Sequence, residues 1–144
     1  MKKHFFHLIV ALTILSCTKD DYNTDKDDTN VDSNNCGFET VISAEQYENA
    51  PSDQVTINGF EIIDHCLKIN FSSGDMWEVK LIDSENILES SPPQRNLRLS
   101  LKNEELCEAY ITKELTFDIS NLQADGDKVQ LSFTNSDDSI LYEY

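Results

Sequence analysis

Basic residues are scarce in this chain of 144 residues. Lys and Arg together number 11, against 27 Asp and Glu, so the formal net charge at pH 7 is −16. Nucleic acid is excluded as an expected partner, because its phosphates would be repelled. An anionic lipid surface would repel the chain in the same way, whereas solubility and attraction of cations are favoured.

Histidine is also rare, and signatures of catalysis are missing. Beyond residue 16 the only histidine is His65, between Asp64 and Cys66. Neighbours in a strand point to opposite faces, which favours a turn histidine over a Cys-His nucleophile pair. The chain contains no G-x-S-x-G, P-loop, G-x-G-x-x-G or H-E-x-x-H motif, and its cysteines lack zinc-site spacing. We therefore expect no enzyme, no cofactor and no metal site.

A long hydrophobic run is absent from the start of the chain. The apolar stretch over residues 5–15 is 11 residues long, whereas a spanning helix needs about 20. Lys2 and Lys3 precede this stretch, and the small residue Ser16 follows it. This is the layout of a secretory signal peptide, so we expect residues 1–16 to be removed rather than to span a membrane.

The end of this signal resembles a known processing motif. Ile14-Leu15-Ser16-Cys17 resembles the lipobox of bacterial lipoproteins, with Leu15 in place of the commoner Ala or Ser. The resemblance implies that Cys17 becomes a lipidated amino terminus. Several acyl chains on one residue anchor durably, since each buried methylene contributes about 0.8 kcal/mol. The alternative is an ordinary signal followed by an incidental cysteine.

The next residues resemble the export signal of Bacteroidota-type lipoproteins, in which a Lys and two acidic residues follow the lipidated cysteine. Lys19, Asp20 and Asp21 match that pattern. The resemblance implies a protein anchored in the outer membrane and facing the cell exterior. The alternative is a solvated linker without a sorting role.

Apolar residues are nearly absent from residues 18–35, where only Tyr22 and Val31 could be buried. Such a segment cannot offset the entropy of ordering, and its like charges extend it. We expect residues 17–35 to form a disordered acidic linker. Residues 36–144 remain, a length that suits one domain with its own core.

Alternating apolar residues dominate this domain. Six windows show the pattern, at residues 67–71, 77–81, 97–101, 115–119, 129–133 and 140–144. They predict an all-β, antiparallel β-sandwich of about seven to nine short strands. Trp77, the one tryptophan, falls in the second window, which favours a core position over stacking on carbohydrate.

Turn residues separate several windows. Residues 72–75 fit a hairpin between the first two windows, and residues 124–127 and 135–139 separate the last three.

Two further irregularities are predicted. Asn58-Gly59 indicates a bulge in one long strand rather than a tight hairpin, because two three-residue strands would be marginal. Ser43 and Gln46 form a capping-box pattern, which predicts a short helix near residues 44–49.

The last three windows resemble the final strands of immunoglobulin-like domains. The domain also resembles small, largely uncharacterised β-sandwich lipoproteins of the Bacteroidota type, through residues 66–74, 103–110 and 115–123. These resemblances imply an immunoglobulin-like β-sandwich and bring no activity with them. A lipocalin-like barrel with an enclosed ligand is the structural alternative, which the Pro-rich break fits less well.

The loop over residues 90–96 is the most suggestive surface. Pro92 and Pro93 stiffen it, and Gln94 and Arg95 follow them. We expect Arg95 to project from a preordered recognition loop. The alternative is that the prolines only rigidify a connection, which a central strand could not accommodate.

Cysteines number four, and Cys17 is assigned to the lipid. Cys36, Cys66 and Cys107 remain, so at least one thiol is free in the monomer. An oxidising compartment favours a bridge, with three possible pairings. The lookalike domains carry another cysteine in the loop matching residues 72–75, suited to pair with the one matching Cys107. This resemblance implies that Cys107 has lost its partner and that Cys36 pairs with Cys66.

The sequence as a whole predicts a lipid-anchored, non-enzymatic protein of the cell envelope with a binding or structural role. Its partners would be the membrane, through the lipid, and a protein or glycan ligand of unknown identity. The alternative is a small secreted ligand carrier or hydrolase. A filled core without an enclosed pocket favours a binding surface, whereas a deep pocket with converging polar groups favours the alternative.

Overall fold

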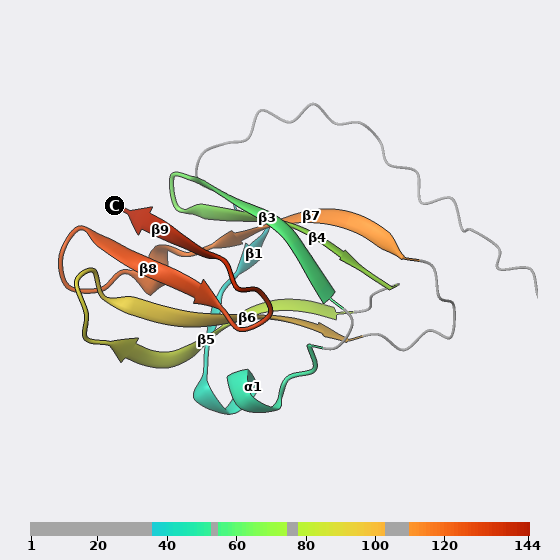
Figure 1. Cartoon of the computed structure of the whole chain (residues 1–144), viewed down its shortest axis with the longest axis horizontal. Coiled ribbons are helices and arrows are strands. Elements are labelled where there is room, and N and C mark those ends of the chain that lie inside the picture. Colours follow the sequence, from blue (N-terminus) through green and yellow to red (C-terminus); the bar gives the residue numbers. More distant parts are fainter. Residues whose placement is uncertain (1–35, 53–54, 75–77, 103–109) are drawn as a thin grey trace, which may run out of the picture.

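Two β-sheets packed face to face make up the domain in the computed structural model (Figure 1). The structure describes residues 36–52, 55–74, 78–102 and 110–144. The expectations for residues 1–35, including the signal peptide, Cys17, the export signal and the linker, lie outside the described residues. Trp77 and Cys107 lie outside them as well.

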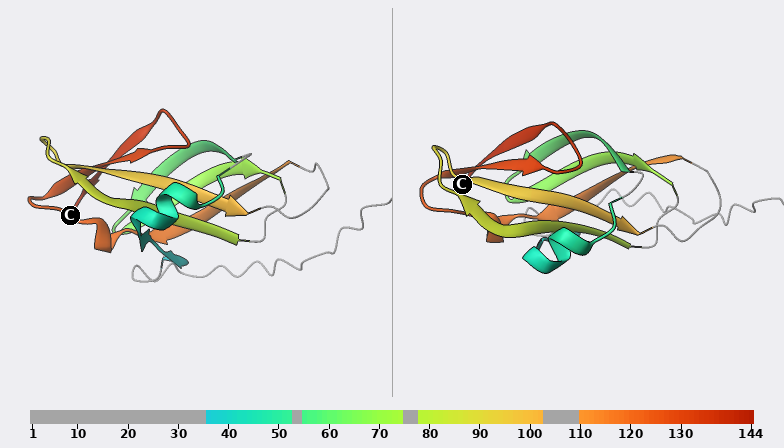
Figure 2. Two further views of the ribbon diagram at one scale, coloured as in Figure 1. Left: turned by 90° about the horizontal axis from the view of Figure 1, so that it is seen from below. Right: turned by 60° about the horizontal axis from the view of Figure 1, so that its bottom comes forward.

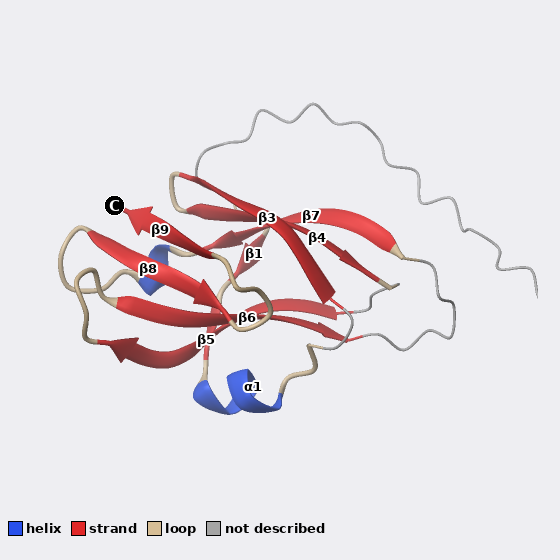
Figure 3. Ribbon diagram, viewed as in Figure 1, coloured by secondary structure: helices blue, strands red, loops and turns tan. Residues whose placement is uncertain are grey.

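The first sheet has the order β1-β7-β4-β3, and the second has the order β2-β5-β6-β8-β9. The strands of the first sheet are β1 (Phe38–Glu39), β7 (Ile111–Asp118), β4 (Cys66–Ser73) and β3 (Val55–Ile63). Those of the second are β2 (Val41–Ile42), β5 (Glu78–Leu88), β6 (Gln94–Lys102), β8 (Lys128–Phe133) and β9 (Ser139–Glu143). A short helix, α1 (Ala44–Asn49), and a 3₁₀ turn, η1 (Ser120–Leu122), complete the described elements (Figure 3). The all-β class and the short helix predicted from the sequence are confirmed.

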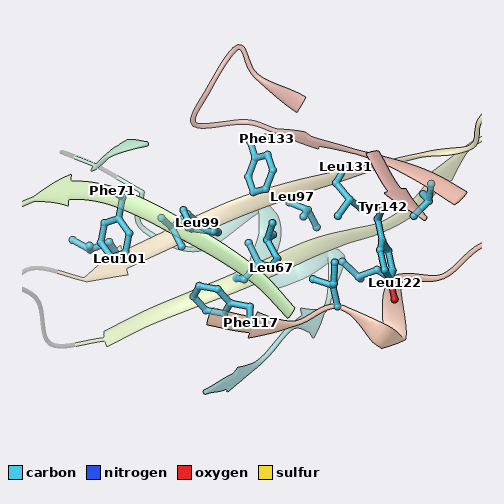
Figure 4. Packing of buried hydrophobic residues seen from close by; sticks show 14 residues of the cluster. Leu67, Phe71, Leu97, Leu99, Leu101, Phe117, Leu122, Leu131, Phe133 and Tyr142 are labelled. Atoms are coloured by element: carbon cyan, nitrogen blue, oxygen red, sulfur yellow. The ribbon is translucent and has the colours of Figure 1, made fainter. Parts of the chain in front are cut away.

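The core fills the space between the sheets, and the alternating residues of the sequence supply it. Leu67, Ile69 and Phe71 of β4 are fully buried, because β4 has a neighbouring strand on each side and faces the second sheet. Figure 4 shows Leu67 and Phe71 of β4 facing side chains of β6, β8 and β9 from the opposite sheet, among them Leu97, Leu131 and Tyr142. Each large apolar side chain buried in this way contributes about 1.5–3 kcal/mol.

The expectation of a purely antiparallel sandwich is wrong, since both sheets are mixed. Strands β6 and β8 pair in parallel, with Gln94 opposite Gln130. The physical reason is that β7, which lies between them in the sequence, belongs to the other sheet. The chain therefore crosses over and returns to run in the same direction. The short strands β1 and β2 also pair in parallel, with β7 and β5 respectively.

The hairpin expected around residues 72–75 is also wrong. Strand β4 pairs with β3 and β7, and β5 begins in the other sheet, so both sides of β4 are already occupied. The described strands fall into two sheets rather than the one closed sheet that the lipocalin-like alternative requires.

Three other predictions about local structure are confirmed: a bulge, a helix cap and a hairpin. Strand β3 runs unbroken from Val55 to Ile63, with a register shift between Ile57 and Gly59, so the bulge is confirmed. Ser43 caps α1, and its Oγ accepts a hydrogen bond from the Gln46 N–H at 3.2 Å. Strands β8 and β9 form the hairpin expected from the turn between them.

The first described residues form a strap across both sheets. β1 adds to the edge of the first sheet beside β7, and β2 adds to the edge of the second beside β5. A disulfide joins Cys36 to Cys66 at the start of β4, with the two Cα atoms 5.4 Å apart. This is the pairing that the resemblance implied.

Candidate functional site

A groove opens between α1 and the end of β5, on the outer face of the second sheet. We call it the α1 groove, and its volume is about 410 Å³. Seen from below in Figure 2, α1 lies in front of the sheet that contains β5 and β6. The lining residues come from both elements and from β6: Ala44, Tyr47, Glu48, Ser84, Asn86, Ile87, Leu88 and Asn96.

The floor of the groove is shaped by a bulge in β5. The pairing of β5 with β6 shifts register between Asp83 and Ile87. Within the bulge the Asp83 Oδ1 accepts a hydrogen bond from the Glu85 N–H at 2.9 Å. Glu85 takes a positive φ of 66°, in the left-handed region that non-glycine residues seldom adopt. This turn re-aims the residues that follow, so that Asn86, Ile87 and Leu88 border the groove.

A buried ion pair holds the bulge from the interior side. The Arg95 Nη1 lies 2.9 Å from the Asp83 Oδ1, and the two side chains are 8% and 0% exposed respectively. Burial raises the pKa of the Asp83 carboxyl, and the charge of the Arg95 guanidinium opposes that rise. Among the described residues, the Asp83 Oδ2 and the Arg95 Nε have no hydrogen-bond partner.

The expectation that Arg95 projects from a preordered recognition loop is wrong. Arg95 belongs to β6 and lies on the same face as Leu97, which is fully buried in the core. The guanidinium therefore points between the sheets and is paired with Asp83. Arg95 does not line the groove. Its role in this site is to position the bulge through the ion pair with Asp83.

The remaining residues of the predicted loop connect β5 to β6. Pro92, Pro93 and Gln94 are half-buried. The Pro93 carbonyl accepts a hydrogen bond from the Gln130 N–H at 2.8 Å, which ties the loop to β8. Pro93 also lines a second groove, of about 500 Å³, which shares Ile87 with the α1 groove. The loop is thus held to β8 where it follows the end of β5.

Helix α1 forms the other wall and is fixed to the sheet by Arg98. The guanidinium of Arg98 lies 5.1 Å from the centre of the Tyr47 ring. Its Nη1 donates a hydrogen bond to the Ala50 carbonyl at 3.1 Å, at the end of the helix. The Tyr47 hydroxyl shares a hydrogen bond with the Thr134 hydroxyl. The Ser43 N–H donates to the Asp83 carbonyl at 3.1 Å, so the start of α1 is fixed to the bulge.

Several polar groups lining the groove keep free hydrogen-bonding capacity. The Asn86 Nδ2 donates to the Ser84 carbonyl at 3.2 Å, which leaves its Oδ1 as an acceptor. The Ser84 side chain is buried, and its Oγ has no hydrogen-bond partner among the described residues. Beside these groups, Ile87 and Leu88 are 45% and 48% exposed and form an apolar lip. The groove therefore offers amide and apolar surface side by side.

His65 takes no part in this site. It lies in the turn between β3 and β4, and its Nδ1 shares a hydrogen bond of 2.7 Å with the Tyr142 hydroxyl. The turn position agrees with the interpretation favoured from the sequence. In the part of the chain that the structure describes, no cluster of His, Cys, Asp and Glu is arranged to hold a metal ion. No helix within the same ranges is both long and apolar enough to cross a bilayer.

Sequence reasoning missed the α1 groove. Its polar lining residues, Asn86 and Asn96, interrupt or flank alternating windows and carry no motif. The one available signal was the stretch Asp83-Ser84-Glu85-Asn86, which breaks the alternation of β5 with four polar residues in a row. Such a break in a central strand is typical of a bulge.

The described residues thus define an all-β domain of two packed, mixed sheets with an open groove beneath a short helix. No family model matches the chain, and no curated protein matches it. A solved structure of a DUF1344 protein of unknown function from Bacteroides vulgatus is similar in fold, with a TM-score of 0.50 and 12% sequence identity. The similar region covers 74% of this chain and 55% of that one, so the chain spans about half the length of that protein. At this identity the likeness concerns the fold alone.

Proposed function

We propose that this chain is a lipid-anchored, non-enzymatic protein of the outer membrane that faces the cell exterior and binds a ligand in the α1 groove. In this proposal the two sheets are a divergent immunoglobulin-like β-sandwich, in which the parallel pairing of β6 with β8 is a departure from the usual antiparallel order. Nucleic acid is not a partner, because the net charge is −16.

The observation that carries the binding role is the way the groove is built. A fully buried carboxylate, Asp83, holds a residue with positive φ, Glu85, in a bulge that borders the groove. Buried charges and positive φ values both cost free energy, and such costs collect at functional sites. At the groove surface the Asn86 Oδ1 is at the same time left with unused hydrogen-bonding capacity.

The anchoring role is supported by the processing pattern ending at Cys17 and by the acidic residues after it. The disulfide between Cys36 and Cys66 joins the start of the domain to the first sheet, whereas the α1 groove lies on the outer face of the second. A domain attached to the membrane through the residues that precede Cys36 therefore keeps the groove accessible.

The open shape of the groove supports a binding surface over the carrier alternative, because a carrier encloses its ligand. The hydrolase alternative finds no support among the described residues that line the groove, where Ser84 lies beside Asn86 and Asn96 and no histidine is present. A serine nucleophile needs an adjacent base to activate it.

The anchor is tested by Cys17→Ala in the full chain, expressed in a bacterium that processes lipoproteins. We expect the substitution to abolish incorporation of a fatty-acid probe and to release the protein from the membrane fraction. Cys107→Ala is the matched control and should label like the unsubstituted chain. Unchanged labelling of the Cys17→Ala chain would contradict lipid anchoring.

A further inference from the structure

We infer that the α1 groove binds a neutral saccharide. This inference rests on the proposed function, since it names the ligand class for the same groove. It is carried by four properties of the groove: the kinds of polar groups in the lining, the apolar surface beside them, the absence of cations among the described lining residues, and the rigidity of the walls.

The polar groups match the chemistry of sugars. A sugar presents hydroxyl groups, each of which donates and accepts a hydrogen bond, and a side-chain amide offers both functions in one plane. Asn86 and Asn96 supply two amides to the groove, and Glu48 supplies an acceptor. Asn96 and Glu48 make no side-chain hydrogen bond or ion pair to any residue that the structure describes.

An apolar surface accompanies these groups. A sugar ring also carries C–H groups on its faces, which lose contact with water when they lie against an apolar side chain. Ile87 and Leu88 stand at the rim of the groove, almost half exposed. A sugar ring held by the amides of the floor can place one face against this lip.

The charges of the residues that line the groove favour one class of saccharide over another. Among the described residues that line the groove there is no Lys or Arg, and the one carboxylate is that of Glu48. The nearby Arg98 is already engaged by the Tyr47 ring and the Ala50 carbonyl, on the sheet side of α1. An acidic saccharide would meet repulsion without a compensating cation, so a neutral one is favoured.

The walls of the groove do not need to be ordered on binding. The bulge is fixed by Asp83 and Arg95, and α1 is fixed by Ser43 and Arg98. Preorganised groups avoid the cost of immobilising side chains and loops when the ligand binds. The volume of about 410 Å³ lies within the range of roughly 300–1,000 Å³ typical of small-ligand sites.

A peptide added to the edge of β5 is the competing occupant. Beyond Asp83 the short strand β2 no longer covers that edge. The bulge between Asp83 and Ile87 breaks the regular spacing of backbone donors and acceptors, however, and bulges of this kind hinder strand addition.

The test uses the full chain, purified in a detergent without a sugar headgroup and passed over immobilised saccharides. The neutral probes are cello-, malto-, manno- and xylo-oligosaccharides, the acidic probe is an oligogalacturonide, and a mixed library of extended peptides represents the competitor. We expect retention by at least one neutral probe and none by the acidic probe. Asn96→Ala should weaken the retained interaction about tenfold, the loss expected for one buried hydrogen-bonding group.

Gln130→Ala is the matched control. Gln130 is a half-buried amide on β8, in the same sheet, and does not line the groove. This variant should bind like the unsubstituted chain, and thermal unfolding of both variants checks that they fold. Retention of peptides alone, lost in Asn96→Ala, would overturn the saccharide assignment and leave ligand binding in the groove standing. Failure of Asn96→Ala to weaken any interaction would overturn both.

Discussion

The ion pair of Asp83 and Arg95 lies in the interior of the domain, between the two sheets. Removing two charges from water costs several kcal/mol per ion, and their attraction repays that cost only when both partners are present. Here one oxygen of Asp83 serves both Arg95 and the backbone of Glu85, so the pair and the bulge depend on each other.

Replacing one partner should therefore be costly. We expect Arg95→Met to lower the free energy of unfolding by about 3–5 kcal/mol at pH 7, because a buried Asp83 carboxylate is left unpaired. Urea denaturation monitored by circular dichroism measures the change. The double substitution Asp83→Leu with Arg95→Met removes both charges and should recover a large part of the loss. A double variant less stable than Arg95→Met would contradict this account.

The same variant gives a pH dependence with a definite sign. Burial raises the pKa of Asp83 above its ordinary value, and without Arg95 only the hydrogen bond from the Glu85 N–H opposes the rise. A carboxyl whose pKa is raised on folding contributes stability below its unfolded pKa of about 3.8, and that stability is lost as the pH rises through the folded pKa. The stability gap between wild type and Arg95→Met should therefore narrow from pH 7 to pH 4. A gap that widens on acidification would refute the assignment.

The sequence contained enough information to bury both residues. Leu97, Leu99 and Leu101 lie on the core face of β6, and one further step of two residues reaches Arg95. The same step from Leu81 reaches Asp83 in β5. The alternation therefore places both charges on the core faces of their strands, although it does not show that β5 and β6 are neighbours. The prolines before Arg95 suggested an exposed loop instead, because Pro-rich connections usually lie at the surface.

At the scale of the elements, alternation predicts which face of a strand is buried but not which strands are neighbours. The windows at β4, β6 and β8 are buried on their inner faces, as expected. Nothing in their alternation distinguishes a hairpin of β4 with β5 from a crossover between sheets. Neighbours are decided by long-range packing, which a local pattern does not encode.

Helix α1 is short enough for its cap to matter. Its six residues have no buried side chain of their own to secure them. We expect Ser43→Ala, which removes the acceptor for the Gln46 N–H, to lower the free energy of unfolding by about 1 kcal/mol. Ser139→Ala, at an exposed strand position, is the control and should change stability by less than about 0.5 kcal/mol. Equal effects of the two would count against a capping role.

The disulfide joins two elements 30 residues apart. Closing a loop of that length stabilises the folded chain by about 3–4 kcal/mol, mainly by restricting the unfolded state. Cys66→Ser should lower the free energy of unfolding by this amount, as measured by denaturant unfolding.

Peptide mapping of the alkylated, non-reduced protein should recover Cys36 and Cys66 as one linked peptide and Cys107 as an alkylated thiol. Recovery of Cys107 within a bridge would refute the pairing.

At the scale of the whole molecule, the proposed attachment through the residues before Cys36 and the proposed binding site in the α1 groove involve different sheets. Replacing Lys19, Asp20 and Asp21 together by Ala should remove the sorting signal and leave the lipid in place. We expect the substituted protein to become resistant to protease added to whole cells while still labelling with a fatty-acid probe. Unchanged cleavage on whole cells would show that these residues do not direct surface display.

The Cys36–Cys66 link has a mechanical consequence. Tension applied through the residues before Cys36 would otherwise reach β1 and β2, which are only two residues long and could peel from their sheets one hydrogen bond at a time. The covalent link passes the load to Cys66, at the start of a strand with neighbours on both sides. Displacing Cys66 then requires the pairing of β4 with both β3 and β7 to be disrupted. The domain should withstand more force when oxidised than when reduced.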